Sequence, residues 1–273
     1  MTYNTVIASD SDRQEILEFI SRGDLGMNVW LTQAVNSILG SPADHQHVLV
    51  CRSAEETVGV AAISGSPDTG LSDSYRLRMD AVDREAAGAL MDALPEGVMG
   101  HFQVFHPMLQ SYLGERQCSD SAMFNPYFTV SQEQFRPVGS DGVVEFTAAD
   151  AGLFEGCEQQ REWEHMGAEN RVLGITIGGR AASSVACSPV TPMMPSGQRV
   201  VAISGLFTEE KHRRKGLGRQ IVSRATELIL RDGNIPCYWT EPENTASQGL
   251  CLSLGYYQYA REMRCSWRNE PTR

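Results

Sequence analysis

The chain has 273 residues, of which 41% are hydrophobic and 21% are charged, and its formal net charge is −11. These values exclude a disordered chain and allow one large domain or two ordinary ones with sizeable cores. No segment reaches the length of a membrane span, no N-terminal basic region precedes an apolar stretch, and the seven scattered cysteines form no C-x-x-C pair. We therefore expect a cytoplasmic protein without a membrane partner, a zinc site or a disulfide framework.

The first half of the sequence predicts two helices followed by a hairpin and alternating elements. Apolar residues at helical spacing predict helices over 11–22 and 27–39. Short apolar runs around a polar turn predict a hairpin, and further runs follow before a proline-bearing stretch. In chain order, the later elements are strands at 47–51, 58–63 and 75–79, a helix at 82–93, and strands at 98–104 and 127–130.

A polar stretch over 136–142 is the best linker candidate, and after it the order of elements restarts. The second half is predicted to hold a strand at 143–146, a helix at 148–165, a hairpin at 172–177 and 181–187, a buried strand at 200–208, a helix ending at 231, a strand at 237–240, a helix at 244–253 and a strand at 257–267. The recurrence of hairpin, strand, helix, strand and strand predicts a degenerate duplication, with domains at 1–138 and 141–273.

The most informative stretch is the turn between the buried strand and its helix, Arg213-Arg214-Lys215-Gly216-Leu217-Gly218. The first backbone N–H groups of a helix have no partners within it, and the helix dipole adds positive potential there, so an anion such as a diphosphate is favoured. Gly216 and Gly218 let that anion approach the backbone.

The charge distribution agrees with a small polyanionic ligand. Residues 1–140 hold eight arginines, no lysine and eighteen acidic residues, whereas both lysines of the chain, Lys211 and Lys215, lie beside the glycine turn. Nucleic acid usually requires a broader basic face, so it is not an expected partner.

The C-terminal half resembles the GCN5-related N-acetyltransferase (GNAT) superfamily. Arg213 to Gly218 fits the acyl-CoA loop pattern Arg/Gln-x-x-Gly-x-Gly/Ala, and the strand 203–208 precedes it at the usual short step. The segment 244–256 is similar to a second signature, an Asn followed by a helix and a Gly-aromatic pair. The resemblance covers residues from about 141 to the end, and for the first 140 residues it rests on element order alone.

The resemblance implies an α/β (α+β) fold with a mixed, mostly antiparallel sheet flanked by helices, in two tandem GNAT-like domains. It also implies acetyl-CoA as co-substrate, with no metal. The implied cofactor contacts are Leu206, Phe207, Thr208, Arg213, Arg214, Lys215, Gly216, Leu217, Gly218, Arg219, Asn244 and Ser247. The first half has no such loop and is expected to shape the acceptor cleft rather than bind CoA in the same way.

The catalytic groups are less determined. Many members of the superfamily carry a Tyr seven residues after the Asn, where this chain has Cys251, and Tyr256 is a nearby alternative acid. A buried Cys is more often an apolar filler than a proton donor. The strand 200–205 has no carboxylate, so Glu241 is the leading candidate base, with Glu162 and Glu164 as weaker ones.

The sequence thus predicts an N-acyltransferase that moves an acetyl or other short acyl group from acyl-CoA to a primary amine by direct attack in a ternary complex. The acceptor is a small amine or a protein amine, and the protein is expected to be a monomer or homodimer. The alternative is a non-catalytic acyl-CoA-binding or sensory protein that kept the CoA loop. Cys251 and the acid-free strand favour that alternative.

Overall fold

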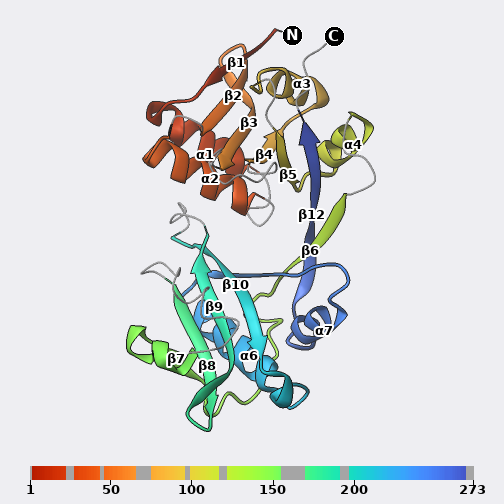
Figure 1. The fold of residues 1–273 in the computed structure, drawn as a ribbon. Coiled ribbons are helices and arrows are strands. Elements are labelled where there is room, and N and C mark those ends of the chain that lie inside the picture. Colours follow the sequence, from red (N-terminus) through yellow and green to blue (C-terminus); the bar gives the residue numbers. More distant parts are fainter. Residues whose placement is uncertain are drawn as a thin grey trace. The chain divides into compact units, whose positions relative to one another are not determined.

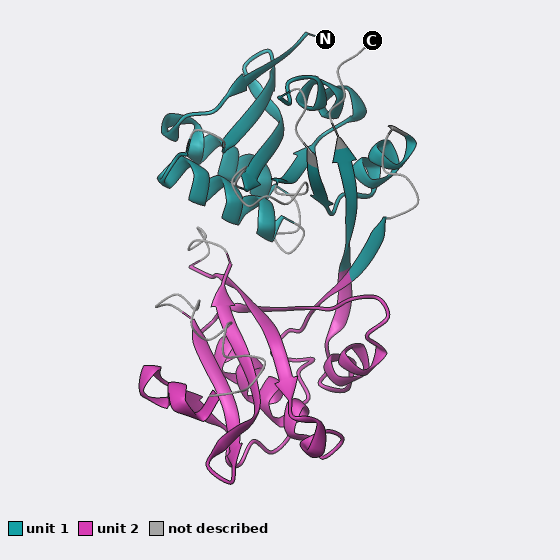
Figure 2. Ribbon diagram, in the orientation of Figure 1, with its two compact units in different colours: residues 1–125, 260–273 teal, residues 126–259 magenta. Residues whose placement is uncertain are grey.

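The protein divides into two compact units in a computed structural model that describes residues 2–22, 28–43, 46–65, 75–95, 99–116, 122–154, 170–190 and 197–268. Unit 1 comprises residues 1–125 and 260–273, and unit 2 comprises residues 126–259 (Figure 2). Both units are built on a mixed sheet, as Figure 1 shows. The expected mixed, mostly antiparallel sheet flanked by helices is confirmed.

The sheet of unit 1 has the strand order β1-β2-β3-β4-β5-β12. Neighbours are antiparallel except for the parallel pair β4 and β5. Its elements are β1 (Tyr3–Ile7), α1 (Arg13–Ser21), α2 (Val29–Gly40), β2 (His47–Ser53), β3 (Glu56–Gly65), β4 (Tyr75–Ala81), α3 (Arg84–Asp92), β5 (Met99–Val104), α4 (Pro107–Arg116) and part of β12 (Tyr257–Arg268).

Alternate residues of the strands in unit 1 pack into two separate cores, because successive side chains of a strand point to opposite faces of the sheet. Val48 and Val60 pack with apolar residues of α1 and α2, such as Ile16 and Val35. The other face, which includes Phe102, packs with apolar residues of α3 and α4. Helices therefore cover both faces of this sheet.

Unit 2 repeats this plan with the strand order β6-β11-β10-β9-β8-β7, in which β10 and β11 are the parallel pair. Its elements are part of β6 (Met123–Thr129), β7 (Val144–Phe146), a 3₁₀ helix (Ala148–Phe154), β8 (Arg171–Ile177), β9 (Arg180–Pro189), β10 (Val200–Thr208), α6 (Leu217–Arg231), β11 (Ile235–Trp239) and α7 (Thr245–Ser253). Buried residues of α6 and α7 pack on this sheet.

Each unit takes a strand from the other half of the sequence. Residues 263–268 of β12 pair with β5 in unit 1, and the end of β6, at Tyr127 and Phe128, pairs with β11 in unit 2. The compact units therefore divide the chain at 125/126 and 259/260, rather than at the polar stretch 136–142. Hydrophobic patterning locates these strands but does not say which neighbour each of them pairs with.

Two elements of unit 1, β1 and α4, are absent from the elements predicted from the sequence. β1 is an edge strand whose Ile7 is 65% exposed, so it has no apolar face to mark it. α4 does carry a signal, since Pro107 opens it and Leu109, Tyr112 and Leu113 are buried at helical spacing. The helix expected at 148–165 begins as the 3₁₀ turn of Ala148–Phe154, and residues 155–169 lie outside the described ranges.

Cys265 is disulfide-bonded, whereas Cys51, Cys187, Cys237 and Cys251 are buried and form no disulfide. None of the helices among the described residues is long and apolar enough to cross a bilayer. Within the same ranges, no group of three or more His, Cys, Asp or Glu side chains is placed to hold a metal ion.

Candidate acyl-CoA site

The pairing between the two parallel strands of unit 2, β10 and β11, ends about halfway along β10. Their pairing runs from Val200 opposite Ile235 to Ile203 opposite Tyr238 and ends there, while β10 stays paired with β9 as far as Thr208. A bulge between Ser204 and Phe207, with Gly205 at φ 63°, adds one residue to β10. Bulges bend a strand and re-aim its edge. Beyond Ile203, β10 therefore no longer pairs with the described residues of β11.

The turn after β10 leads into α6 without a side-chain cap. Arg214 and Gly216 both have positive φ, at 58° and 84°, and Gly216 is the N-cap of α6. No side chain of the described residues caps this helix. Its first N–H groups, from Leu217 onward, therefore point out of the helix without an acceptor from a cap, which is the arrangement that binds anions.

Packing holds the beginning of α6 against β10 and α7. A Cβ atom added at Gly218 would lie 3.5 Å from Leu206 Cδ2 on β10 and 3.5 Å from Leu250 Cδ1 on α7. These are ordinary contact distances, so the backbone of Gly218 already sits close to both side chains. Apolar residues Ile221, Val222 and Ala225 anchor the rest of the helix to the sheet. The open helix end and the bulged strand are thus held side by side.

The cationic side chains around the turn have different roles. Arg213 Nε donates a hydrogen bond to Thr208 O at 3.0 Å, and Arg219 Nη2 donates to Ser253 O at 3.4 Å, so both tie the turn to its neighbours. Lys211 pairs with Glu209 at 2.9 Å and lowers the pKa of that carboxyl. Arg214 and Lys215 are exposed. They add positive charge beside the helix end, where an anion would bind.

The predicted contacts Asn244 and Ser247 are engaged within the protein. Asn244 is the N-cap of α7 and its Oδ1 accepts a hydrogen bond from Ser247 N at 3.1 Å. Ser247 Oγ lies 2.6 Å from the hydroxyl of Tyr238, on β11. These bonds fix the start of α7 beside the point where β10 and β11 separate. Tyr238 is the polar side chain at this point that the sequence patterns missed; only its place in an aromatic strand marks it.

Of the predicted acids, Cys251 and Tyr256 lie in the core. Cys251 is fully buried, its thiol donates to Gln248 O at 3.2 Å, and burial raises its pKa to about 12. The hydroxyl of Tyr256 lies 2.6 Å from Thr226 Oγ1, which donates to Val222 O, so the phenol is the donor in that pair. Burial raises the pKa of Tyr256 well above its usual value. This geometry favours packing roles for both residues.

Glu241 is the residue that the sequence predicts as the base. It follows β11 by two residues and its side chain is exposed, while its backbone carbonyl accepts from Asn244 N at 3.1 Å and from Gln248 Nε2 at 3.3 Å. These bonds fix the backbone of Glu241 beside the start of α7. Glu162 and Glu164, the weaker candidates, lie outside the described residues.

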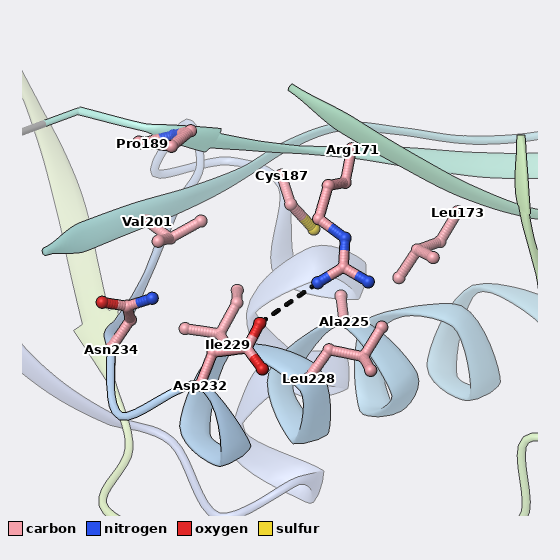
Figure 3. A pocket seen from close by; sticks show the side chains of 10 residues that line it. All are labelled: Arg171, Leu173, Cys187, Pro189, Val201, Ala225, Leu228, Ile229, Asp232 and Asn234. Carbon is pink, nitrogen blue, oxygen red and sulfur yellow. Dashed lines mark hydrogen bonds and ion pairs between the residues drawn. The ribbon is translucent and has the colours of Figure 1, made fainter. Parts of the chain in front are cut away.

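A small cavity of about 90 Å³ lies under α6, apart from the open strands and the helix end. Figure 3 shows Ala225, Cys187 and Leu173 on its walls and the ion pair between Arg171 and Asp232, at 3.2 Å, across it. Its lining is mainly apolar. This space separates part of α6 from the sheet.

Comparisons with known proteins agree with this geometry. Residues 197–265 match the family model of the FR47-like proteins. The matched segment contains β10, the turn, α6, β11, α7 and most of β12. None of the curated proteins matches the chain in sequence.

Similar solved structures extend over the whole chain. An acetyltransferase of the GNAT family from Colwellia psychrerythraea is 12% identical, with a TM-score of 0.64 over 98% of this chain and 100% of that one. A GCN5-related N-acetyltransferase from Sphaerobacter thermophilus is 10% identical, with a TM-score of 0.63 over 99% and 97%. A tandem GNAT protein from the clavulanic acid biosynthesis pathway is 13% identical, with a TM-score of 0.62 over the full length of both chains.

At these identities the likeness concerns the fold, and the FR47-like match adds the sequence of the strand, turn and helix that form the site. The resemblance predicted from the sequence is therefore confirmed: the chain has the tandem fold of the GCN5-related N-acetyltransferases, with the FR47-like signature in its second half.

Proposed function

We propose that unit 2 binds acyl-CoA and transfers an acetyl or other short acyl group to a primary amine. The observation that carries this proposal is the conjunction of two features on one strand. β10 leaves β11 after Ile203, and the turn that follows β10 ends at a helix without a side-chain cap. An extended arm ending in a diphosphate needs both features at adjacent places.

The residue roles follow from the positions of the backbone. Leu206, Phe207 and Thr208 would form main-chain hydrogen bonds with the pantetheine arm, and the N–H groups from Arg214 to Gly218 would hold the diphosphate. Arg213 and Arg219 support the turn through their bonds to Thr208 O and Ser253 O. Asn244 and Ser247 support the start of α7 rather than the cofactor directly.

In the proposed reaction, the neutral amine attacks the thioester carbonyl, a carbon–nitrogen bond forms, and the carbon–sulfur bond breaks to release the CoA thiolate. Glu241 receives the proton lost by the amine, directly or through water. A backbone N–H in the open part of β10 stabilises the negative charge that develops on the carbonyl oxygen. Because CoA thiolate is a good leaving group, the reaction does not need Cys251 as an acid.

The alternative function, a non-catalytic acyl-CoA-binding protein, is supported by the same core positions. Cys251 donates to Gln248 O and Tyr256 donates to Thr226, so neither hydroxyl nor thiol is directed to a thioester. β10 carries no carboxylate before its bulge. A protein with this function would bind acyl-CoA but would not transfer the acyl group to any amine.

Two measurements on the full chain separate these functions. Isothermal titration with acetyl-CoA should show one saturable site, and thiol release across a panel of primary amines should exceed the rate without amine. Binding without thiol release on any amine would support the non-catalytic protein. Absence of binding would contradict both.

A substitution at Glu241 tests whether this residue is the general base. Glu241→Gln removes the proton acceptor and keeps the side chain's size, so thiol release should fall at least about tenfold, in line with the usual contribution of a general base. Glu243→Gln, two residues further along the same exposed loop, is the matched control. Equal rates for the two variants would exclude Glu241 as the base.

A further inference from the structure

Unit 1 has a polar area on the sheet face that lies opposite the α3 and α4 core. Leu77, Phe102 and Met263 belong to that core, and the residues that alternate with them point to the other side. The register places Arg76 beside His101 on the parallel pair, and Gln103 opposite Arg264 on the antiparallel pair. Four polar side chains of β4, β5 and β12 are therefore neighbours across three strands.

These residues line a cavity of about 400 Å³. Its walls include Arg76, His101, Gln103, Arg264 and Ser266, all of them within unit 1. Small-molecule sites usually enclose roughly 300–1,000 Å³, so the space suits a small organic ligand rather than a single water.

Gln103 supplies an independent sign that a ligand belongs there. It is 9% exposed, and its Oε1 has no hydrogen-bond partner among the described residues. A buried acceptor left without a donor costs on the order of 1–3 kcal/mol. A ligand with an N–H or O–H group in the cavity would remove that cost.

A buried carboxylate fixes one guanidinium at the wall of this cavity. Arg264 Nε donates to Glu262 Oε2 at 2.7 Å, and Asn125 Nδ2 donates to the same oxygen at 3.2 Å. Glu262 is fully buried, and it does not line the cavity. Arg76 has no ion-pair partner among the described residues. The residues that line the cavity thus include two arginines and no carboxylate.

We propose that this cavity of unit 1 binds a small organic anion, whose carboxylate or phosphate group is held by Arg76 and Arg264 and whose N–H or O–H group donates to Gln103. Guanidinium groups suit both anions because their planar donors match pairs of oxygens. The site does not depend on the acyl-CoA assignment of unit 2.

The test uses the full chain carrying Gly216→Glu, because the beginning of α6 is a second place where an anion could bind. Isothermal titration at constant ionic strength would use two probes, 3-phosphoglycerate and citrate, which each combine an anionic group with a hydroxyl. We expect at least one probe to bind at a single site with a Kd below about 1 mM, the weak end of specific affinity. The stronger probe identifies the preferred anion.

Two further substitutions, each made in the same Gly216→Glu chain, locate the binding. Arg76→Ala removes an exposed cation and Gln103→Glu places a like charge beside the ligand, so each should weaken binding at least about tenfold, as expected for loss of a charge-assisted contact. Arg84→Ala, at an exposed arginine of α3, is the matched control and should leave the affinity within about twofold. The proposal is overturned if neither probe saturates, or if folded Arg76→Ala and Gln103→Glu chains bind as tightly as the parent.

Discussion

The two helices that follow the parallel strands, α3 in unit 1 and α6 in unit 2, occupy the same place in the fold and begin in opposite ways. Asp83 caps α3, and its carboxylate accepts a hydrogen bond from Ala86 N at 2.8 Å. Gly216 begins α6 with a positive φ and no side-chain cap. Unit 1 therefore carries its own anion at the position where unit 2 leaves room for an external one. A shared fold does not imply a shared ligand.

The strands that precede these helices in the chain, β4 and β10, also differ between the two units. β4 pairs with β3 from Gly65 to Gly59 without interruption, whereas β10 is bulged against β9 between Ser204 and Phe207. A cofactor of this shape needs both the bulged strand and the open helix end. Unit 1 has neither, and the FR47-like match, at residues 197–265, covers the bulged strand and the open helix end of unit 2.

The largest expected effect comes from giving α6 an anion of its own. Gly216→Glu places a carboxylate where a phosphate would bind, so the affinity for acetyl-CoA should fall at least about 100-fold, or about 2.7 kcal/mol. No atom lies within 4 Å of a Cβ at this position, so the fold should survive. Isothermal titration measures the affinity.

Gly216→Ala is the control for this change, because it has the same backbone cost at φ 84° and no charge. That cost is about 1–2 kcal/mol for a residue with a side chain. If Gly216→Ala and Gly216→Glu weaken binding equally, backbone strain rather than charge is responsible, and the diphosphate assignment fails.

The packing of the two helices on their sheets provides the next comparison. A Cβ at Gly59 on β3 would lie 2.9 Å from Leu90 Cδ1 on α3, whereas a cavity of about 90 Å³ separates α6 from its sheet. Gly59→Ala should therefore lower the free energy of unfolding by about 1–3 kcal/mol through overpacking. Urea unfolding followed by circular dichroism measures it. In a Leu90→Ala background, Gly59→Ala should cost less than it does in the parent chain; an equal cost in both backgrounds would contradict the contact.

Removing the cap of α3 should have a smaller effect. Asp83→Ala leaves the first turn of α3 without its acceptor and also removes the hydrogen bond from the Tyr3 hydroxyl, at 3.1 Å. We expect a loss of about 1 kcal/mol in the free energy of unfolding. Asp83→Asn keeps an acceptor and should lose less.

The same variant tests whether the capping side chain alone distinguishes the units. Because β4 lacks the bulge, Asp83→Ala should still bind a single equivalent of acetyl-CoA. A second equivalent would show that a free helix end is sufficient.

The sequence predicts the open helix of unit 2 well because its markers are local. Gly216 and Gly218 lie next to the strand they serve, and most of the helices and strands follow from spacing alone. Tyr238, the exchange of β6 and β12, and the packing of Cys251 against Gln248 depend on contacts between distant residues. The core positions of Cys251 and Tyr256 follow from burial, which a single sequence does not specify at polar or small side chains.

The cavity beneath α6 predicts a stabilising substitution. Cys187→Val adds volume to the wall opposite α6 and suits a strand, so it should raise the free energy of unfolding by about 0.5–1 kcal/mol. Cys187→Ala enlarges the same cavity and should lower it by about 1 kcal/mol. Urea midpoints of the two variants measure both effects. A loss with Val would mean that the cavity cannot accept the added methyl group.

The smallest expected effect concerns Cys251, for which the structure favours a packing role. Since burial raises the pKa of its thiol to about 12, the thiol keeps its proton throughout the range from about pH 6 to 9 and adds no rise or fall to the rate there. Cys251→Ala should therefore keep the rate of thiol release within about threefold at saturating acetyl-CoA, with the same pH profile. Cys237→Ala, at another buried cysteine of the same unit that forms no disulfide, is the matched control. A fall of more than about tenfold for Cys251→Ala alone, at unchanged affinity, would assign the proton donor to Cys251 after all, because an acid acts on turnover and a filler acts on stability.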